Sequence, residues 1–450
     1  MPSFARTIAL AVAAALAAPC SAAEAKRVLH AAEFATAEST TCGIQEAVNA
    51  LPPEGGVVTV PPGRYVMRQS VVLRPHVTVQ GSGSSTILTR PAEVYSKLAR
   101  PARKGDTAVE VQSSQGFRPG DQVAVFDDVM HGWYMGHAIL AKVEPGRLAL
   151  AAPIENGHPD GVYSLERSAA VVNYFPFFRA STMHFGPPVA DVAVLDLTLD
   201  GNLAENPGPW TDFTLSAIHF ANVSDGLIRG VTVRGSVGDG IGVQGGRDNR
   251  VESCLVEECR GHGFHPGTSL SGATFSGNIG RNNGGDGLYF CCQVVGITVT
   301  GNLFHGNKRS GIGGLGAGCG TSDSFNVVAN NVCRENALWG IEAGGGRNNV
   351  ISGNVCVDNS QSSPGRYSGI IISDSTHTLV TGNRCGSEAE KPAQKFGIEE
   401  SGASDHNLFT GNLCTGNRDG GLATVGKNTQ VSANLGTNHK PGQPATPPGK

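Results

Sequence analysis

Side chains able to transfer protons are concentrated between residues 239 and 289. Asp239, His262 and Asp286 each open a short box that continues with glycine and an apolar residue. His265 and Tyr289 come directly after the second and third of these boxes. Abstraction of a proton from a sugar carbon next to a carboxylate needs a base such as His or Tyr and a group that stabilises the resulting anion. The sequence therefore predicts lyase- or epimerase-type chemistry, with His265 as the base and Tyr289 as the acid or an alternative base.

The neighbouring polar residues have supporting roles in this hypothesis. The box-opening residues Asp239, His262 and Asp286 are expected to orient the proton-transfer groups or to bind a cation. Gln244 lies at the sixth position of its box and is expected to contact a substrate carboxylate. Ca²⁺ is the one cofactor left open, although the sequence has no clear acidic cluster typical of a calcium site.

Two other functions fit the same residues. Asp239 and Asp286 would stand roughly 9 to 10 Å apart if they lie two coils apart. This is near the upper limit of about 9.5 Å for the carboxyl pair of an inverting glycoside hydrolase. Asp-Gly is also a favoured turn, so a non-catalytic glycan-binding or surface protein is the third hypothesis.

The elements that must position these residues are revealed by a repeat. Successive boxes are separated by 23, 24, 24, 29, 29, 28 and 24 residues. Short β-branched, alternating runs within each unit indicate strands, and this period is typical of a solenoid. The third residue of a box should point inward, and the fourth and sixth outward. The boxes begin at Asp239, His262, Asp286, Ser310, Trp339, Ser368, Phe396 and Gly420.

Two kinds of residue column support this register. Asparagines recur at fixed distances from the boxes, and such columns are expected at coil corners, where side-chain amides can bond to one another. A cysteine follows two residues after four of these asparagines, which predicts an inward column of small side chains whose redox state the sequence leaves open. The asparagines eight residues before a box are Asn278, Asn302, Asn331 and Asn412, and Asn354 and Asn383 keep the same local motif with longer loops after it. The cysteines that follow Asn331, Asn354, Asn383 and Asn412 are Cys333, Cys356, Cys385 and Cys414.

Composition divides the chain into four parts. Residues 1–25 contain an arginine, an apolar run and small residues, which is typical of a secretory signal, so the mature chain is expected to be secreted or periplasmic. Residues 41–436 are expected to form the solenoid, which a short helix caps at its start. Residues 93–155 lose the period and predict a small lateral β insertion. Residues 437–450 are polar and proline-rich, which predicts disorder.

Two segments resemble known proteins. The stretch GGVVTVPPGRY resembles the start of many β-helix proteins of the pectate-lyase superfamily. The stretch HGFHPG, followed by GGDG, is similar to the catalytic segment of the mannuronan C5-epimerases and related alginate lyases, whose motif is Tyr-Gly-Phe-Asp-Pro-His. The catalytic residues of that family are not retained. At their positions this chain has His262, His265, Gly267 and Cys291.

The resemblance and the repeat together predict an all-β protein, a right-handed parallel β-helix with an N-terminal capping helix. Its expected partner is a polysaccharide that contains uronate. The net charge of −4 gives no reason to expect nucleic acid or a membrane as a partner. The oligomeric state is left open.

Overall fold

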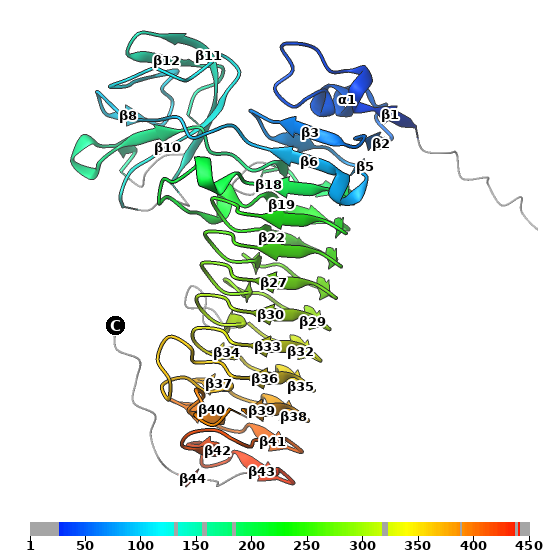
Figure 1. Ribbon diagram of the computed structural model, residues 1–450, viewed down its shortest axis with the longest axis vertical. Helices are drawn as coiled ribbons and strands as arrows, with labels where there is room; N and C mark the ends of the chain where they lie inside the picture. The colour runs from blue at the N-terminus through cyan, green and yellow to red at the C-terminus, as the bar shows by residue number, and fades with distance from the viewer. Residues whose placement is uncertain are drawn as a thin grey trace, which may run out of the picture.

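The computed structural model describes residues 27–129, 134–154, 160–181, 186–316, 323–387, 389–436 and 440–441. The expected signal segment, residues 1–25, lies outside these residues. The described chain is a long solenoid of parallel strands, with its N-terminal coils at one end and its C-terminal coils at the other (Figure 1). No described helix has the length and apolar character needed to span a membrane.

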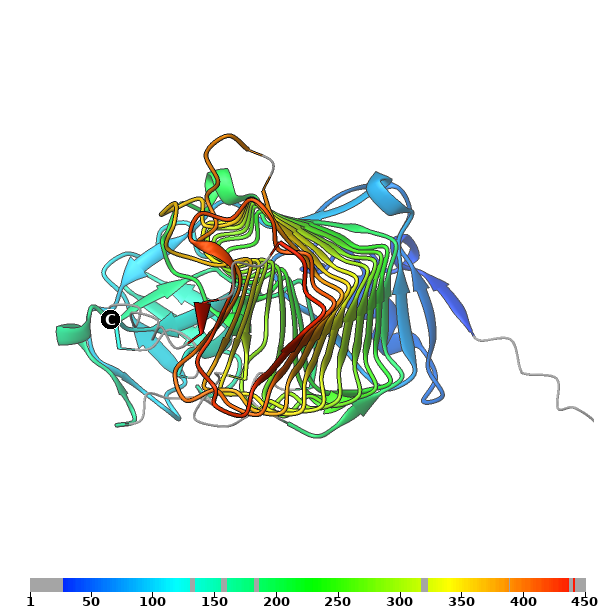
Figure 2. The same cartoon turned by 90° about the horizontal axis from the view of Figure 1, so that it is seen from below.

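Three parallel sheets run along the solenoid, and most coils contribute one strand to each sheet. Sheet I contains β1 (Val28–His30), β2 (Gly56–Thr59), β5 (Val77–Gln80), β17 (Ala193–Leu195), β20 (Leu227–Arg229), β23 (Arg250–Glu252), β26 (Thr274–Ser276), β29 (Thr298–Thr300), β32 (Val327–Ala329), β35 (Val350–Ser352), β38 (Leu379–Thr381), β41 (Leu408–Thr410) and β43 (Gln430–Ser432). Viewed along its axis, the solenoid shows these coils stacked in register (Figure 2).

Sheet II carries the boxes. It contains β4 (Val71–Leu73), β15 (Phe178–Ala180), β19 (Ile218–Ser224), β22 (Ile241–Arg247), β25 (Phe264–Gly267), β28 (Leu288–Tyr289), β31 (Ile312–Leu315), β34 (Ile341–Gly344), β37 (Ile370–Ser373), β40 (Phe396–Ser401), β42 (Gly420–Thr424) and β44 (Lys440–Pro441), with β16 (Val189–Ala190) beside β19. Sheet III contains β3 (Gly63–Val66), β6 (Thr86–Thr89), β18 (Thr198–Asp200), β21 (Thr232–Arg234), β24 (Leu255–Glu257), β27 (Ile279–Arg281), β30 (Leu303–His305), β33 (Val332–Arg334), β36 (Val355–Val357) and β39 (Arg384–Gly386).

The register of sheet II confirms the repeat. Ile241 pairs with Phe264, which pairs in turn with Leu288, and all three side chains are buried in the interior. His265 lies beside Gly242 on the outer face. The third residue of each box is therefore an inward residue, as alternation along a strand requires.

Asparagine columns hold the coil corners. In the first column, the side-chain amide of Asn278 donates to Asn302 Oδ1 at 3.0 Å, and that of Asn302 donates to Asn331 Oδ1 at 2.8 Å. Each asparagine also accepts the backbone N–H of the asparagine before it, as in Asn278 N to Asn302 Oδ1 at 2.8 Å. The left-handed backbone falls on the preceding residue, such as Gly277 or Asn330, and not on the column asparagines themselves. The column asparagines thus stabilise the corners through their side chains, and the residue before each one makes the turn.

The cysteine column lies in the solenoid interior. Cys333 pairs with Cys356, and Cys356 with Cys385, on neighbouring strands of sheet III. These three side chains and Cys414 are buried free thiols. They pack as small apolar groups next to the asparagine columns.

The N-terminal end of the solenoid is covered by the helix α1 (Ile44–Ala50), whose residues Ile44, Ala47 and Val48 are buried. Strand β1 already pairs with β2, so the first sheet begins before the expected start at residue 41. Short 3-10 helices lie in the loops: η1 (Ala31–Glu33), η2 (Gly83–Ser85), η3 (Leu165–Arg167), η4 (Leu203–Glu205) and η5 (Phe213–Leu215).

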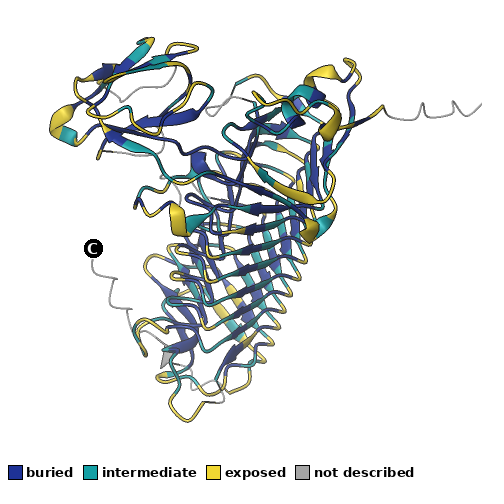
Figure 3. Cartoon of the chain, turned by 45° about the horizontal axis from the view of Figure 1, so that its top comes forward, coloured by how far each residue is buried: buried dark blue, intermediate teal, exposed yellow. Residues whose placement is uncertain are grey.

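A separate antiparallel sheet lies beside the first coils, and its buried side chains form a hydrophobic core of their own, apart from that of the solenoid (Figure 3). It extends beyond the expected end at residue 155, because β14 lies between β7 and β10. At the other end of the chain, β44 pairs with β42, so part of the segment expected to be disordered continues the open edge of sheet II. The lateral strands are β7 (Tyr95–Lys97), β14 (Ala170–Val172), β10 (Gln122–Phe126), β11 (Gly136–Glu144), β12 (Arg147–Leu150) and β9 (Ala108–Glu110), with the pair β8 (Ala102–Arg103) and β13 (Val162–Tyr163).

Candidate functional site

The box-opening side chains form one column at the rim of sheet II. Asp239 Oδ1 accepts the backbone N–H of His262 at 2.6 Å, and His262 Nδ1 accepts that of Asp286 at 3.0 Å. Asp286 Oδ1 continues the pattern by accepting the N–H of Ser310 at 2.6 Å. Each side chain thus fixes the corner of the next coil, which gives all three a structural role whatever their chemistry.

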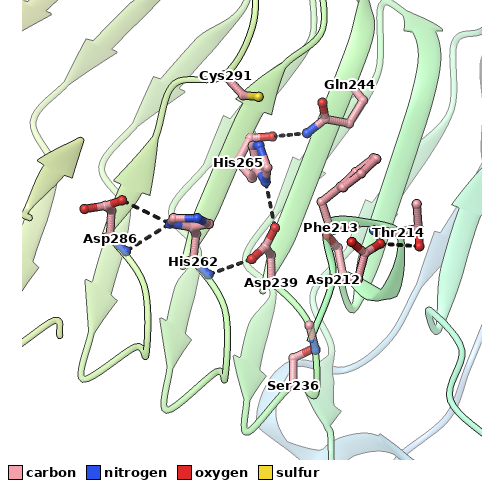
Figure 4. A network of polar contacts seen from close by, with 12 residues as sticks. Asp212, Phe213, Thr214, Ser236, Asp239, Gln244, His262, His265, Asp286 and Cys291 are labelled. Carbon is pink, nitrogen blue, oxygen red and sulfur yellow. Dashed lines mark hydrogen bonds and ion pairs between the residues drawn. The ribbon is translucent and has the colours of Figure 1, made fainter. Parts of the chain in front are cut away.

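A buried histidine and carboxylate form the centre of the site (Figure 4). His265 Nδ1 lies 2.7 Å from Asp239 Oδ2, and only 6% of His265 is exposed. Burial alone would lower the pKa of His265, but the Asp239 carboxylate and its hydrogen bond raise it to about 10. Burial opposes the charge on Asp239 as well, yet the imidazole of His265 lowers the pKa of this carboxyl below its ordinary value. The pair is therefore an imidazolium and a carboxylate at neutral pH.

A depression of about 300 Å³ opens beside this pair. Its polar lining comes from Arg260, His262, Tyr289 and Arg309, together with Thr211 and three glycines, and contains no carboxylate among the described residues. His265 is not part of the lining, and its Nε2 is buried without a hydrogen-bond partner among the described residues. The structure thus brings His262 and Tyr289 to the surface of the depression and keeps His265 behind them.

The ring of Tyr289 packs against two histidine rings and against a glycine. Its ring stacks on His262 at 4.4 Å with an angle of 11° between the planes, and lies 5.2 Å from the ring of His265. It also covers Gly314, where a Cβ would come within 2.5 Å of the ring and where φ is +74°. Burial, with the nearby Cys291 and Asp286, raises the pKa of Tyr289 to about 12. The phenol is therefore protonated at neutral pH.

Two of the expected site residues have their polar atoms occupied by the protein. Gln244 is buried, donates to the backbone oxygen of His265 at 3.0 Å and accepts from Thr268 Oγ1 at 2.7 Å, so it supports the strand next to it instead of facing a substrate carboxylate. Asp286 is fully buried, and its Oδ2 lies 3.2 Å from both His262 Nδ1 and Arg309 Nε.

Two carboxyl groups that the sequence reasoning missed lie near the site. Glu342 occupies the fourth position of its box, and burial together with the charge of Asp286 raises its pKa to about 7, against the opposing effect of Arg309. The signal in the sequence is this fourth position, which strand alternation directs outward. Asp212 lies outside the repeat, next to η5, and burial raises its pKa to about 6. No repeat-based signal could have placed it beside Asp239 (Figure 4).

Family models match two parts of the chain. Residues 196–319 match a family described as right handed beta helix region, and residues 296–439 match one described as periplasmic copper-binding protein (NosD). Each match covers less than half of the chain. No curated protein matches in sequence.

Solved structures share the fold. The A-module of the Azotobacter vinelandii mannuronan C-5 epimerase AlgE4 aligns with a TM-score of 0.55 and 16% identity, over 94% of this chain and 100% of that one. The AlgE6 A-module of the same organism gives 0.54 and 16%, over 90% and 99%. PfbA, a surface adhesin of Streptococcus pneumoniae, gives 0.54 and 12%, over 92% and 93%. The chain is a right-handed parallel β-helix protein, distantly similar to the mannuronan C5-epimerases in fold.

A metal centre does not fit the described residues. No group of three or more His, Cys, Asp or Glu side chains among them could hold an ion. The cysteine column within the copper-binding match is enclosed in the interior. Neither copper nor the Ca²⁺ left open by the sequence therefore enters the chemistry considered below.

Proposed function

We propose that the protein is a carbohydrate-active enzyme that acts on a uronate-containing polysaccharide by lyase- or epimerase-type proton abstraction. The observation that carries this proposal is the depression at the rim of sheet II, where Arg309 lies with Tyr289 and His262 and no described carboxylate lines the surface. Arg260 adds positive charge to this lining, while its Nη1 and Nη2 donate to Trp210 O and Asn206 O. Arginine pairs well with carboxylates, because its planar guanidinium can donate two parallel hydrogen bonds. Such a surface favours an acidic sugar over a neutral one.

Tyr289 and Glu342 are the proton-transfer groups in this proposal. The neutral Tyr289 phenol donates a proton to the sugar, since its pKa of about 12 keeps it protonated. Glu342, with a pKa of about 7, is ionised in part near neutral pH and takes the proton from the carbon next to the carboxylate. Glu342 lies outside the lining of the depression, but it is partly exposed and interacts electrostatically with Tyr289 and Arg309, which are part of that lining. The proposal therefore requires the sugar to extend past Arg309 to Glu342.

His265 has a different part from the one the sequence suggested. At neutral pH its ring carries a positive charge, which lies near Tyr289 and helps to balance negative charge that develops on the sugar. Asp239 fixes the orientation of the ring through the 2.7 Å contact. His265 is thus proposed as a positioning and electrostatic residue, with Glu342 in place of it as the base.

Hydrolysis by Asp239 and Asp286 is less well supported. The Asp239 oxygens accept from His262 N and contact His265 Nδ1, and Asp286 is fully buried beneath its partners. A hydrolase needs one carboxyl group able to protonate the leaving oxygen and one able to activate water, both at the substrate. The mannuronan C-5 epimerases share this fold, and their epimerase activity favours proton abstraction instead. The periplasmic description of one matching family favours an extracellular or periplasmic location.

The test is incubation of the protein with a panel of acidic and neutral polysaccharides, with ultraviolet absorbance and new reducing ends followed together. Rising absorbance on uronate polymers alone is the expected result for a lyase, since elimination leaves an unsaturated uronate. Absorbance and reducing ends that both stay flat require NMR of the polymer for epimerised residues. Reducing ends without absorbance would indicate hydrolysis. A polymer that is bound and left unchanged would indicate a non-catalytic protein; PfbA, a surface adhesin, has a similar fold.

A further inference from the structure

Cys291 occupies an unusual place among the cysteines. It and Cys42 are the two described free cysteines that are not fully buried. The backbone N–H of Cys291 donates to Pro266 O at 3.0 Å, which sets the side chain above Gly267. A Cβ on Gly267 would come within 3.0 Å of Cys291 Cβ, so the glycine leaves the room that the thiol side chain needs.

The imidazole of His265 is turned toward this thiol. Asp239 binds Nδ1 on one side of the ring, and Cys291 lies on the other side of His265 (Figure 4). Only 6% of His265 is exposed, and its Nε2 has no hydrogen-bond partner among the described residues. After the effects of burial and Asp239, interaction with Cys291 is the next cause that acts on the pKa of His265, and it raises it. The other titratable rings that face His265 are His262 at 5.4 Å and Tyr289 at 5.2 Å.

We propose that Cys291, His265 and Asp239 form a reactive-thiol site that is modified by low-molecular-weight organic disulfides. His265 is already an imidazolium at neutral pH, held in place by Asp239, and its positive charge stabilises the Cys291 thiolate, whose proton is released to solvent. The thiolate then attacks one sulfur of the disulfide, so that a new S–S bond joins Cys291 to that sulfur and the other half leaves as a thiolate. No further oxidant is needed. The site requires neither a polysaccharide nor proton transfer by Tyr289, so it goes beyond the proposed function.

A disulfide-bonded neighbour defines the competing reaction. Cys291 Sγ lies 3.1 Å from Cys292 Sγ, and Cys292 is already in a disulfide. A thiolate at Cys291 has two targets, the added disulfide and the sulfur of Cys292. The location of the adduct distinguishes them.

Cys42 supplies an internal control. Its thiol donates to Val66 O at 3.4 Å, and burial, with the nearby Glu46, raises its pKa above the ordinary 9.0. Its thiolate fraction, and hence its rate, should fall about tenfold for each pH unit below that value. Cys291 has a buried imidazole beside it, and Cys42 has an acidic residue.

The experiment treats the full chain with 5,5′-dithiobis(2-nitrobenzoic acid) at pH 6 and pH 8, and maps the adducts by peptide mass spectrometry without reduction. The account predicts that Cys291 reacts at least about tenfold faster than Cys42 at pH 6. His265→Gln should slow Cys291 by about tenfold or more and leave Cys42 unchanged, with Cys291→Ser removing the fast phase. Equal rates at Cys291 and Cys42 at pH 6 would overturn the proposal even if His265→Gln did not fold. An adduct at Cys292 in place of Cys291 would also overturn it.

Discussion

Sheet II carries buried acidic side chains in two places, in the coils around β22 to β34 and in those around β40. In the later coils both oxygens of each carboxylate have partners. Glu399 contacts Lys395 Nζ at 2.7 Å and accepts from Ser368 Oγ at 2.6 Å. Glu400 accepts from the backbone N–H groups of Val425 and Gly426, each at 3.0 Å, as well as from two side chains.

In the earlier coils Asp239 and Asp286 are paired as well, but two other groups differ. His265 Nε2 is buried without a partner among the described residues, and the pKa of Glu342 is raised to about 7 by burial and by the charge of Asp286. Buried polar groups in native proteins are nearly always paired, so unpaired ones mark places where a ligand or a reaction supplies the partner. The comparison therefore separates acids that hold loops in the later coils from groups that are available for chemistry in the earlier ones.

The largest expected effect comes from a matched pair of tyrosines. Tyr289→Phe should lower kcat on a uronate polysaccharide by about 10²- to 10⁴-fold, because the phenol that protonates the sugar is lost. The control is Tyr367, whose ring packs edge-on against Trp339, the residue that opens the second box after that of Tyr289. Tyr367→Phe should leave the rate unchanged. Initial rates of both variants measure the difference. Equal losses of rate in the two variants would contradict a special role for the earlier coils.

A second effect concerns stability. Asp239→Asn should lower the free energy of unfolding by about 2 to 4 kcal/mol at pH 7, because it removes one partner of a buried ion pair. The folded-state pKa of His265, about 10, lies above its ordinary 6.5. The stabilisation from His265 is thus complete below about pH 6.5 and is lost as pH rises through 10, whereas the part from Asp239, whose pKa is lowered, is lost only in acid.

Denaturant unfolding of both proteins at pH 7 and pH 10.5 measures this. The deficit of Asp239→Asn should shrink at the higher pH. Asn331→Ala, which breaks an uncharged column contact, should show a similar deficit at both values. A deficit of Asp239→Asn that does not change with pH would contradict the ion pair.

Glu342 should set the pH dependence of turnover. A base must be deprotonated, so kcat/KM of the wild-type protein should rise about tenfold per unit below pH 7 and level off above it. Glu342→Gln should lower the plateau by about 10²-fold and remove the limb near pH 7. Rate profiles from pH 5 to 9 check this. Glu399→Gln is the control in the later coils, and its profile should keep the limb.

Arginine at the depression should affect binding more than turnover. Arg309→Gln should raise KM for a uronate polymer by about tenfold, which corresponds to about 1.4 kcal/mol of lost binding. Arg334 lies on sheet III, where it pairs with Glu335 at 3.0 Å, and Arg334→Gln should leave KM unchanged. If Arg309→Gln kept the limb near pH 7 and its KM were unaltered, Arg309 would have no role in substrate binding.

Much of this fold could be predicted from the sequence because a solenoid repeats its local rules. The box spacing predicted the inward positions of Ile241, Phe264 and Leu288, and it placed Asp239 and His262 in one column. The site was predicted less completely. Asp212 comes from a loop without repeat, and ionisation of Glu342 depends on burial that no spacing reveals.

Gln244 also shows what the sequence could not predict. Its outward position followed from strand alternation, but the neighbouring coil supplies the backbone oxygen of His265 and the hydroxyl of Thr268 that occupy its amide. Contacts between coils decide whether an outward polar group is free. A single unit of the repeat does not contain that information.

The central claim is proton abstraction at the earlier coils of sheet II, and proton NMR of a uronate polysaccharide treated in D₂O tests it most directly. The account predicts unsaturated terminal sugars or deuterium at the carbon next to the carboxylate, and neither product with Tyr289→Phe. Saturated reducing ends without deuterium at that carbon would contradict it.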